Sequence, residues 1–227
     1  LTHQPLSFSV SETTEGVHIH IIDAELMGKG EKEKKDLYIE GVQNNGIINH
    51  YEYIINSEGT IEIRHVLKPE GKMPLWFPRI GLTLTVSDAL DQVKWYGRGP
   101  QENYPDRKTG YPMGIYASTV QAMYEPYLMP QDYGLRTDVR WLQLTTDKGI
   151  GLQFKINEWF NFNIYPYSTD NLTKAMYTYQ LQKQKGMTLN LDYATTGVGC
   201  TARGVFGAYK AMPQEYRRTI SIKPMMK

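Results

Sequence analysis

The sequence predicts an all-β protein, a large antiparallel β-sandwich, and three observations support this prediction. Apolar and polar residues alternate with a period of two along most of the chain. The apolar residues of this alternation are largely β-branched or aromatic, which suits the half-buried surface of a sheet. Residues 57–59 (Ser-Glu-Gly) and 147–149 (Asp-Lys-Gly) place a glycine between alternating segments, where a hairpin loop needs a positive φ. At 227 residues, without a linker rich in Pro or Ser, we expect a single domain over residues 1–227.

The predicted strands are the segments in which the alternation is clearest. In chain order they are residues 16–25, 36–41, 49–56, 60–67, 79–86, 92–97, 138–145, 151–156, 160–165, 187–193, 205–210 and 218–223. Only residues 87–91 and 169–182 have a sequence that favours a helix, and in the second segment Thr169 or Asp170 would be the N-cap. Tyr177 and Tyr179 weaken the later half of this second segment, so we expect a helical turn followed by a strand there.

Residues 96–133 differ in character from the alternating segments. They are rich in Pro, Gly and Tyr, and we expect them to form a long ordered loop pinned by aromatic side chains. Residues 28–36 are charged and contain glycine, but their charges are mixed in sign, which favours a solvated hairpin tip over a polyanion contact.

The composition excludes several classes of partner. The chain has 25 Lys and Arg against 24 Asp and Glu, a formal net charge of +1, so neither a nucleic acid nor an anionic membrane is an expected partner. No apolar run approaches the roughly 20 residues that a membrane-spanning helix needs. A single cysteine, Cys200, excludes an internal disulfide and leaves a cytoplasmic or periplasmic location open. Because the chain begins with Leu-Thr-His, we expect a piece of a longer protein.

Residues 97–107 (GRGPQENYPDR) form the first candidate site. Glu102, Asp106 and Arg107 lie within a few residues of one another and could form a carboxylate–guanidinium pair. Two acids about 5–9.5 Å apart would suit glycoside hydrolysis. However, a neighbouring arginine lowers the pKa of a carboxyl group instead of raising it to that of a general acid. We therefore expect an internally satisfied structural loop.

Three other candidates each have a structural interpretation. His18 and His20 project from the same face of a strand, which permits metal binding, but no third ligand is identifiable and an exposed sheet face is favoured. An Asn-Glu pair, here residues 157–158, marks the acid/base residue of many retaining glycosidases, yet its flanking strands favour a turn. Cys200 has no CxxC partner or activating neighbour that would indicate a nucleophile.

The aromatic residues support two interpretations equally. The chain contains 17 Tyr, 4 Trp and 6 Phe. Flat rings with a polar group suit the faces of sugars, and the same residues suit the core and rims of a large sandwich.

Several blocks of sequence resemble the last domain of the large bacterial β-galactosidases of glycoside hydrolase family 2. The blocks are residues 78–82 (PRIGL), 93–107 (VKWYGRGPQENYPDR), 124–127 (YEPY), 130–136 (PQDYGLR), 189–192 (LNLD) and 197–199 (GVG). They extend the resemblance from about residue 60 to the C-terminus. Its most specific part is the structural motif made by Gly99, Pro100, Gln101, Glu102, Asn103, Tyr104, Pro105, Asp106 and Arg107.

The resemblance implies a galactose mutarotase-like supersandwich that follows a catalytic barrel and here lacks its opening strands at the N-terminal side. Both catalytic glutamates and the magnesium ligands of the family lie in the barrel, so no catalytic residue, metal or cofactor is expected in this chain. The implied partners are the remaining domains of the same enzyme and its β-galactoside substrate. Unpaired sheet edges also make a homo-oligomer a reasonable expectation.

The function implied by the resemblance is that of the C-terminal domain of a β-galactosidase, which hydrolyses terminal non-reducing β-D-galactosides. The domain would be non-catalytic alone, would support the enzyme and would line the aglycone side of its active site. Thr188 stands where several members carry a Trp that stacks on this side, so Thr188 is the predicted substrate-binding residue. Since a hydroxyl cannot replace an indole face, and residues 200–203 also depart from the family pattern, a differently built aglycone side is expected.

Two alternatives remain open from sequence. A stand-alone carbohydrate-binding module would use a Tyr-rich face of the sandwich. An aldose mutarotase would need a general base with a histidine acid, for which His18, His20, His50 and His65 are the candidates.

Overall fold

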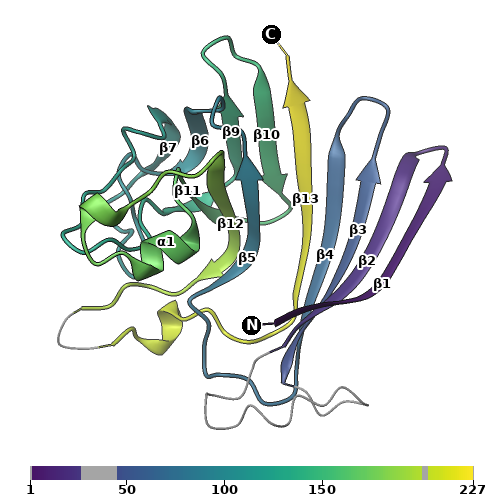
Figure 1. The fold of residues 1–227 in the computed structure, drawn as a ribbon, viewed down its shortest axis with the longest axis horizontal. Coiled ribbons are helices and arrows are strands. Elements are labelled where there is room, and N and C mark those ends of the chain that lie inside the picture. The colour runs from purple at the N-terminus through teal and green to yellow at the C-terminus, as the bar shows by residue number, and fades with distance from the viewer. Residues whose placement is uncertain (1, 27–44, 201–203, 227) are drawn as a thin grey trace. The chain divides into compact units, whose positions relative to one another are not determined.

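The computed structural model describes residues 2–26, 45–200 and 204–226, and its secondary structure is mainly antiparallel β (Figure 1). The predicted hairpin tip at residues 28–36, the predicted strand at 36–41 and residues 201–203 lie outside the described residues. The chain divides into two compact units, residues 1–77 with 212–223 and residues 78–211 with 224–227. The single domain expected over residues 1–227 stays a prediction.

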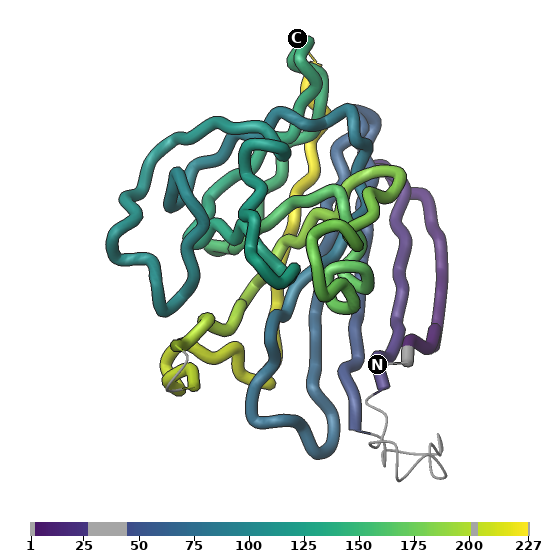
Figure 2. The backbone as a smooth tube through the Cα atoms, turned by 60° about the vertical axis from the view of Figure 1, so that its left-hand side comes forward, coloured from purple at the N-terminus to yellow at the C-terminus, as the bar shows by residue number. Residues whose placement is uncertain are grey.

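The first unit is an antiparallel sheet with the strand order β1-β2-β3-β4-β13. Figure 2 shows its first two strands as the purple hairpin of the chain. The β3–β4 turn confirms the prediction for residues 57–59, because Gly59 has φ +76° and donates its N–H to the Asn56 carbonyl at 3.0 Å. The strands of this unit are β1 (Thr2–Thr13), β2 (Gly16–Leu26), β3 (Gly46–Ile55), β4 (Ile61–Glu70) and β13 (Tyr216–Met225).

The second unit is a sandwich of two antiparallel sheets, which confirms the predicted fold class. One sheet has the order β10-β9-β6-β7 and the other has the order β5-β12-β11-β8. The first set consists of β6 (Gln92–Arg98), β7 (Met113–Thr119), β9 (Trp141–Thr145) and β10 (Gly151–Ile156). The second set consists of β5 (Arg79–Val86), β8 (Arg136–Val139), β11 (Phe160–Tyr165) and β12 (Met187–Thr195).

Large apolar side chains from both sheets fill the core of this sandwich. Trp95 of β6 and Phe162 of β11 are both fully buried, and their rings meet edge to face with centroids 5.9 Å apart. Leu142 and Leu144 extend the core on one sheet and Leu189 extends it on the other. Burying a side chain of this size contributes about 1.5–3 kcal/mol, so this core holds the two sheets together.

The helices are short. α1 (Thr169–Lys174) begins at the predicted residue, but its N-cap is Ser168 instead of Thr169 or Asp170, and the Ser168 hydroxyl accepts from the Asn171 N–H at 3.0 Å. The strand expected after it is wrong, since a 3₁₀ turn (Thr178–Gln180) follows instead. Residues 87–91 form a turn and no helix. No helix in the described part of the chain is long and apolar enough to cross a bilayer.

Several strand predictions need correction. The segment 138–145 is two strands, β8 and β9, in different sheets, because Asp138 near the end of β8 takes φ +55° and the chain then bends at Arg140. Residues 205–210 contain a 3₁₀ turn (Gly207–Tyr209) in place of a strand. Residues 157–158 form the expected turn between β10 and β11. These two strands belong to different sheets, so they do not pair with each other as the flanking sequence suggested.

Two strands were missed by the sequence analysis. β1 alternates cleanly after Pro5, so its signal was present in the sequence. β7 lies inside the segment predicted as a loop and is recognisable as a strand only through its pairing with β6.

Candidate functional site

The loop at residues 99–107 is organised around the buried carboxylate of Glu102. Its Oε2 accepts from the Tyr104 hydroxyl at 3.0 Å and from the Gly134 N–H at 2.8 Å. Its Oε1 accepts from Arg107 Nη2 at 3.0 Å and from the Tyr127 hydroxyl. The predicted carboxylate–guanidinium pair is therefore present between Glu102 and Arg107, and every oxygen of the carboxylate has protein donors.

Burial and the Glu102 charge keep the surrounding donors protonated. Burial, with a further contribution from Glu102, raises the pKa of Tyr104, and the same two causes raise the pKa of Tyr127 to about 12. Burial lowers the pKa of Arg136 to about 10, against the opposing effect of Glu102, so this guanidinium stays charged at neutral pH. Arg136 also lies over the Trp95 ring, 5.4 Å from its centroid.

Asp106 points to a different part of the chain from Glu102. Its two carboxylate oxygens accept from the backbone N–H groups of Val198 at 3.0 Å and Gly199 at 2.7 Å. A Cβ at Gly197 would lie 2.3 Å from the Asp106 carboxyl carbon, so this position needs a glycine. Asp106 therefore anchors residues 197–199 to the motif loop.

Asn103 of the motif, together with Arg98 and Lys108 on either side of it, connects the loop to β8. Asn103 is fully buried and its Oδ1 accepts from the Thr137 N–H at 3.0 Å, while its own N–H donates to the Leu135 carbonyl at 2.8 Å. Asp138 accepts from Arg98 Nε at 2.6 Å and from Lys108 Nζ at 2.8 Å. Burial alone would raise the pKa of Asp138, but these two cations outweigh it and the pKa is lowered.

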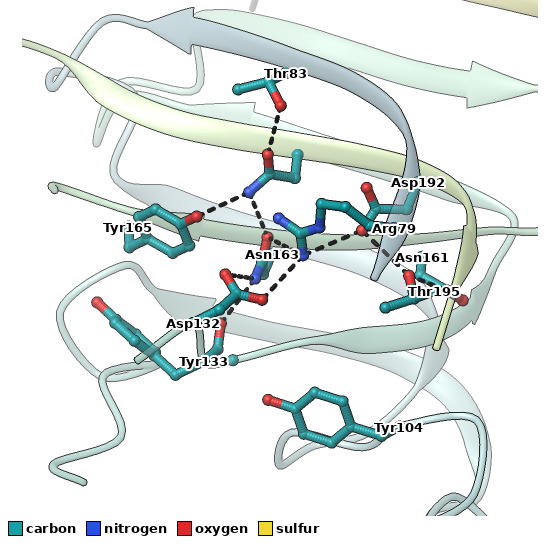
Figure 3. Close-up of polar contacts among 12 residues, drawn as sticks. Arg79, Thr83, Tyr104, Asp132, Tyr133, Asn161, Asn163, Tyr165, Asp192 and Thr195 are labelled. Atoms are coloured by element: carbon teal, nitrogen blue, oxygen red, sulfur yellow. Dashed lines mark hydrogen bonds and ion pairs between the residues drawn. The ribbon is translucent and has the colours of Figure 1, made fainter. Parts of the chain in front are cut away.

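A second polar cluster lies on the sheet of β5, β11 and β12 (Figure 3). Arg79 Nη2 lies 3.0 Å from Asp132 Oδ2 and 3.3 Å from Asp192 Oδ2, so one guanidinium bridges two carboxylates. Burial raises the pKa of Asp192 to about 6, although Arg79 opposes the shift. Burial would lower the pKa of Arg79, but the two carboxylates outweigh it and the pKa is raised.

Asparagine side chains join this cluster into one network. Asn190 Nδ2 donates to Asn163 Oδ1 at 2.8 Å and to the Tyr165 hydroxyl at 3.0 Å, and its Oδ1 accepts from Thr83 at 2.8 Å. Asn163 Nδ2 donates to Asp132 Oδ1 at 2.9 Å. The LNLD block that supplies Asn190 is recognisable in the sequence, but the role of Asn190 is not, because its partners lie on other strands.

A pocket of about 220 Å³ adjoins the second cluster through Asp132. Its lining residues come from the segment before β8, from β11 and from α1, and they are Pro130, Gln131, Asp132, Tyr165, Thr169, Leu172 and Thr173. Asp132 is about half exposed here, whereas Asp192 is buried behind Arg79. A general acid must be able to reach the group to which it gives its proton, and Asp192 cannot do so from behind Arg79. Asp132 and Asp192 are therefore arranged as the ion-pair partners of Arg79.

Thr188 is a buried residue of β12. Its hydroxyl donates to the Tyr167 carbonyl at 2.7 Å and accepts from Gln184 Nε2 at 2.8 Å. Both hydrogen-bonding roles of the hydroxyl are therefore used inside the chain, and the predicted contact of Thr188 with a substrate stays a prediction.

The other residues singled out from sequence are not members of these two clusters. His65 is buried, lies 3.1 Å from Asn49 Oδ1 through its Nε2, and has its pKa lowered to about 4 by burial. His18 and His20 of β2 lie beside Glu52 of β3. Cys200 is exposed.

Together, the antiparallel sandwich and the GPQENYPDR loop, with Glu102 buried at its centre, define an all-β fold in which the motif carboxylates hold loops together. The family model described as the β-galactosidase small chain matches residues 8–222, and the chain belongs to this family.

Curated relatives agree with this family. The chain is 38% identical over 147 residues to a β-galactosidase of Priestia megaterium, a match that covers 65% of this chain and 14% of that protein. It is 39% identical over 122 residues to a β-galactosidase of Vibrio cholerae, which covers 54% of this chain and 11% of that protein. The chain thus spans about a seventh or less of the length of these relatives. Among solved structures, a GalM/aldose epimerase homologue from C. elegans aligns with 96% of this chain and 68% of its own, at 12% identity and a TM-score of 0.46.

Proposed function

We propose that the chain is the C-terminal domain of a β-galactosidase, that it is non-catalytic by itself, and that it supports the enzyme and lines the aglycone side of the active site. Membership of the small-chain family supports the association with β-galactosidases. The main support for the non-catalytic role is that both carboxylate oxygens of Glu102 accept hydrogen bonds from protein donors.

Hydrolysis of a glycoside needs a carboxylic acid that protonates the leaving group and a carboxylate that attacks or activates water. Glu102 is buried under four donors, and Asp106 accepts from two backbone N–H groups. Asp192 is buried against Arg79. Binding a sugar at any of these carboxylates would require breaking several charged hydrogen bonds, each of which contributes about 1.5–3 kcal/mol.

The same bonds suit a supporting role. Glu102 connects the motif loop to Tyr127 and Gly134, and Asp106 connects it to residues 197–199 after β12. Three segments far apart in the sequence are thereby held in one arrangement. Preorganised loops of this kind are what a surface needs if it is to pack against another domain or line a pocket.

The test of the non-catalytic role is an assay of the purified chain with a chromogenic β-galactoside. We expect no release of chromophore above the buffer control. Turnover that follows the chain through successive columns would refute the proposal, whichever carboxylate it depends on.

The proposal that this chain lines the aglycone side of the active site has to be tested in the complete enzyme. Substituting Thr188→Ala there is expected to change KM for substrates with bulky aglycones and to leave inhibition by free galactose unchanged. An equal change in both constants would place the effect on the galactose side and contradict the proposal.

A second candidate, a carbohydrate-binding role, is favoured by two exposed tyrosines. Tyr177 and Tyr179 are 57% and 79% exposed, and their rings stack with centroids 5.4 Å apart and planes 7° apart. Gln180 Oε1 accepts from the N–H groups of Met176 and Tyr177 at 2.8 and 3.1 Å, which fixes the segment. An exposed and fixed aromatic face suits the C–H face of a pyranose.

Titration calorimetry with galactose and lactose tests this candidate. We expect weak binding that Tyr179→Ala abolishes and that Tyr209→Ala, at a partly exposed tyrosine elsewhere, leaves unchanged. Absence of binding at tens of millimolar sugar ends this candidate.

A further inference from the structure

Three possible metal ligands meet on one face of the sheet in the first unit. His18 and His20 are on β2, and Glu52 is on β3 directly across from His20. His18 Nδ1 lies 3.5 Å from Glu52 Oε1, and His20 Nε2 lies 4.0 Å from the same oxygen. All three ligand atoms lie within 4.8 Å of one another. The sequence showed the two histidines but no third ligand, because Glu52 reaches them only through the register of β2 and β3.

The two oxygens of Glu52 have separate surroundings. Oε2 accepts from Arg64 Nη1 at 3.1 Å, whereas Oε1 is the atom that faces both histidines. Arg64 is held a second time, because its Nε donates to Glu62 Oε1 at 2.8 Å. A cation at Oε1 would therefore leave Arg64 in place, and Arg64 would orient the carboxylate as hydrogen-bond partners of metal ligands commonly do.

The site has room and access for an ion. His20 and Glu52 side chains are 50% and 27% exposed. On the other side of β2, the residues paired with His20 and His18 are Ser9 and Ser11, which are small and polar. His18 is more buried, and its Nε2 has no hydrogen-bond partner, so no hydrogen bond to that nitrogen resists a small rotation of the ring.

We propose that His18, His20 and Glu52 bind a divalent transition-metal cation of the Zn²⁺ class, with water in the remaining positions. Two imidazole nitrogens and one carboxylate oxygen are the donors that Zn²⁺ takes, at about 2.0–2.2 Å. In tetrahedral geometry these bond lengths separate neighbouring ligand atoms by about 3.4 Å. The His18–Glu52 separation of 3.5 Å already meets this value, and the His20–Glu52 separation of 4.0 Å needs only a small side-chain movement.

The bound cation would cross-link β2 and β3, because two ligands come from one strand and the third comes from its neighbour. An ion that binds only the folded chain raises the temperature of unfolding. At about a hundred times its dissociation constant we expect a rise of about 5–11 °C for a chain of this size.

The test is titration of the complete chain with zinc chloride, followed by calorimetry and by thermal unfolding. We expect one Zn²⁺ per chain and no binding of Mg²⁺, which prefers oxygen ligands. The variants His20→Ala and Glu52→Gln should each lower the affinity by about tenfold or more. His3→Ala is the matched control, because His3 is an exposed histidine of the same unit outside the cluster, and it should leave the affinity unchanged.

A second measurement keeps the test decisive if a variant fails to fold. In the wild-type chain, zinc should shift the imidazole NMR signals of His18 and His20 and leave those of the other three of the 5 histidines in place. An equal loss of affinity in His3→Ala, or shifts spread over all the histidines, would mean adventitious binding and would overturn the proposal.

Discussion

Replacing Glu102 by glutamine tests whether the motif loop depends on one buried carboxylate. Glutamine has the same shape, but one of its two oxygens becomes an NH₂ group, which donates and cannot accept. All four partners of Glu102 are donors: the Gly134 N–H, the Tyr104 and Tyr127 hydroxyls and the Arg107 guanidinium. Whichever way the amide turns, two donors will face its NH₂ group.

The geometry selects the less costly orientation. If the NH₂ group replaced Oε2, it would face the Gly134 N–H, which cannot turn away. If it replaces Oε1, the Tyr127 hydroxyl can rotate and accept, and Arg107, whose side chain is about half exposed, can turn to water. The Arg107 bond is then lost, but this side chain is about half exposed, so the loss is smaller than the roughly 1.5–3 kcal/mol of a buried charged hydrogen bond. The bonds from Tyr104 and Gly134 to the remaining oxygen are kept but lose the carboxylate charge. We expect Glu102→Gln to lower the free energy of unfolding by about 1–3 kcal/mol.

Urea unfolding followed by tryptophan fluorescence measures this change. The matched control is Glu58→Gln, the same substitution at an exposed position of the β3–β4 turn, which should stay within about 0.5 kcal/mol of wild type. If Glu102→Gln also stays within that range, the carboxylate does not hold the loop and the reasoning is wrong.

Three further predictions concern other parts of the second unit. Gly197→Ala should destabilise the chain by about 1–3 kcal/mol, because the new Cβ meets Asp106. Gly110→Ala, whose Cβ would meet nothing within 4 Å, should not destabilise it. Equal urea midpoints for the two variants would contradict this prediction. The folded Asp192 carboxyl has its pKa raised to about 6 while an unfolded aspartate titrates near 3.9, so the contribution of Asp192 to stability is greatest below about pH 4 and falls by up to about 3 kcal/mol as the pH rises to about 6. Asp192→Asn should abolish this fall, as stability measured between pH 4 and 7 will show. Thr188→Val removes two partly buried hydrogen bonds and should cost about 1–3 kcal/mol, and a neutral effect on the thermal midpoint would show that they contribute nothing.

Local patterns predicted the strands where local physics is sufficient. β5, β10 and β11 begin and end at the predicted residues, because their alternation is clear and turn residues bound them. The 57–59 and 147–149 turns are confirmed, since a glycine with positive φ is a local requirement. The error over residues 138–145 has a tertiary cause: Asp138, which has φ +55°, accepts hydrogen bonds from Arg98 and Lys108, which lie 40 and 30 residues earlier in the chain.

The candidate sites divide in the same way. Sequence alone identified the GPQENYPDR loop and its pairing of Glu102 with Arg107, because these residues are close along the chain. It could not identify Tyr127 or Gly134 as partners of Glu102, nor Asp132 as a partner of Arg79, since these contacts connect distant segments.

The sequence by itself determined the all-β class, most strand positions and the family, because alternation, turn residues and a specific motif are written in consecutive residues. The tertiary structure alone decided which sheet each strand joins, which carboxylates are buried beneath donors, and that Glu52 lies opposite His20. The physical reason is register: a shift of one residue in a strand pair turns every side chain to the other face, so contacts between strands follow from the folded pairing and not from the pattern of either strand.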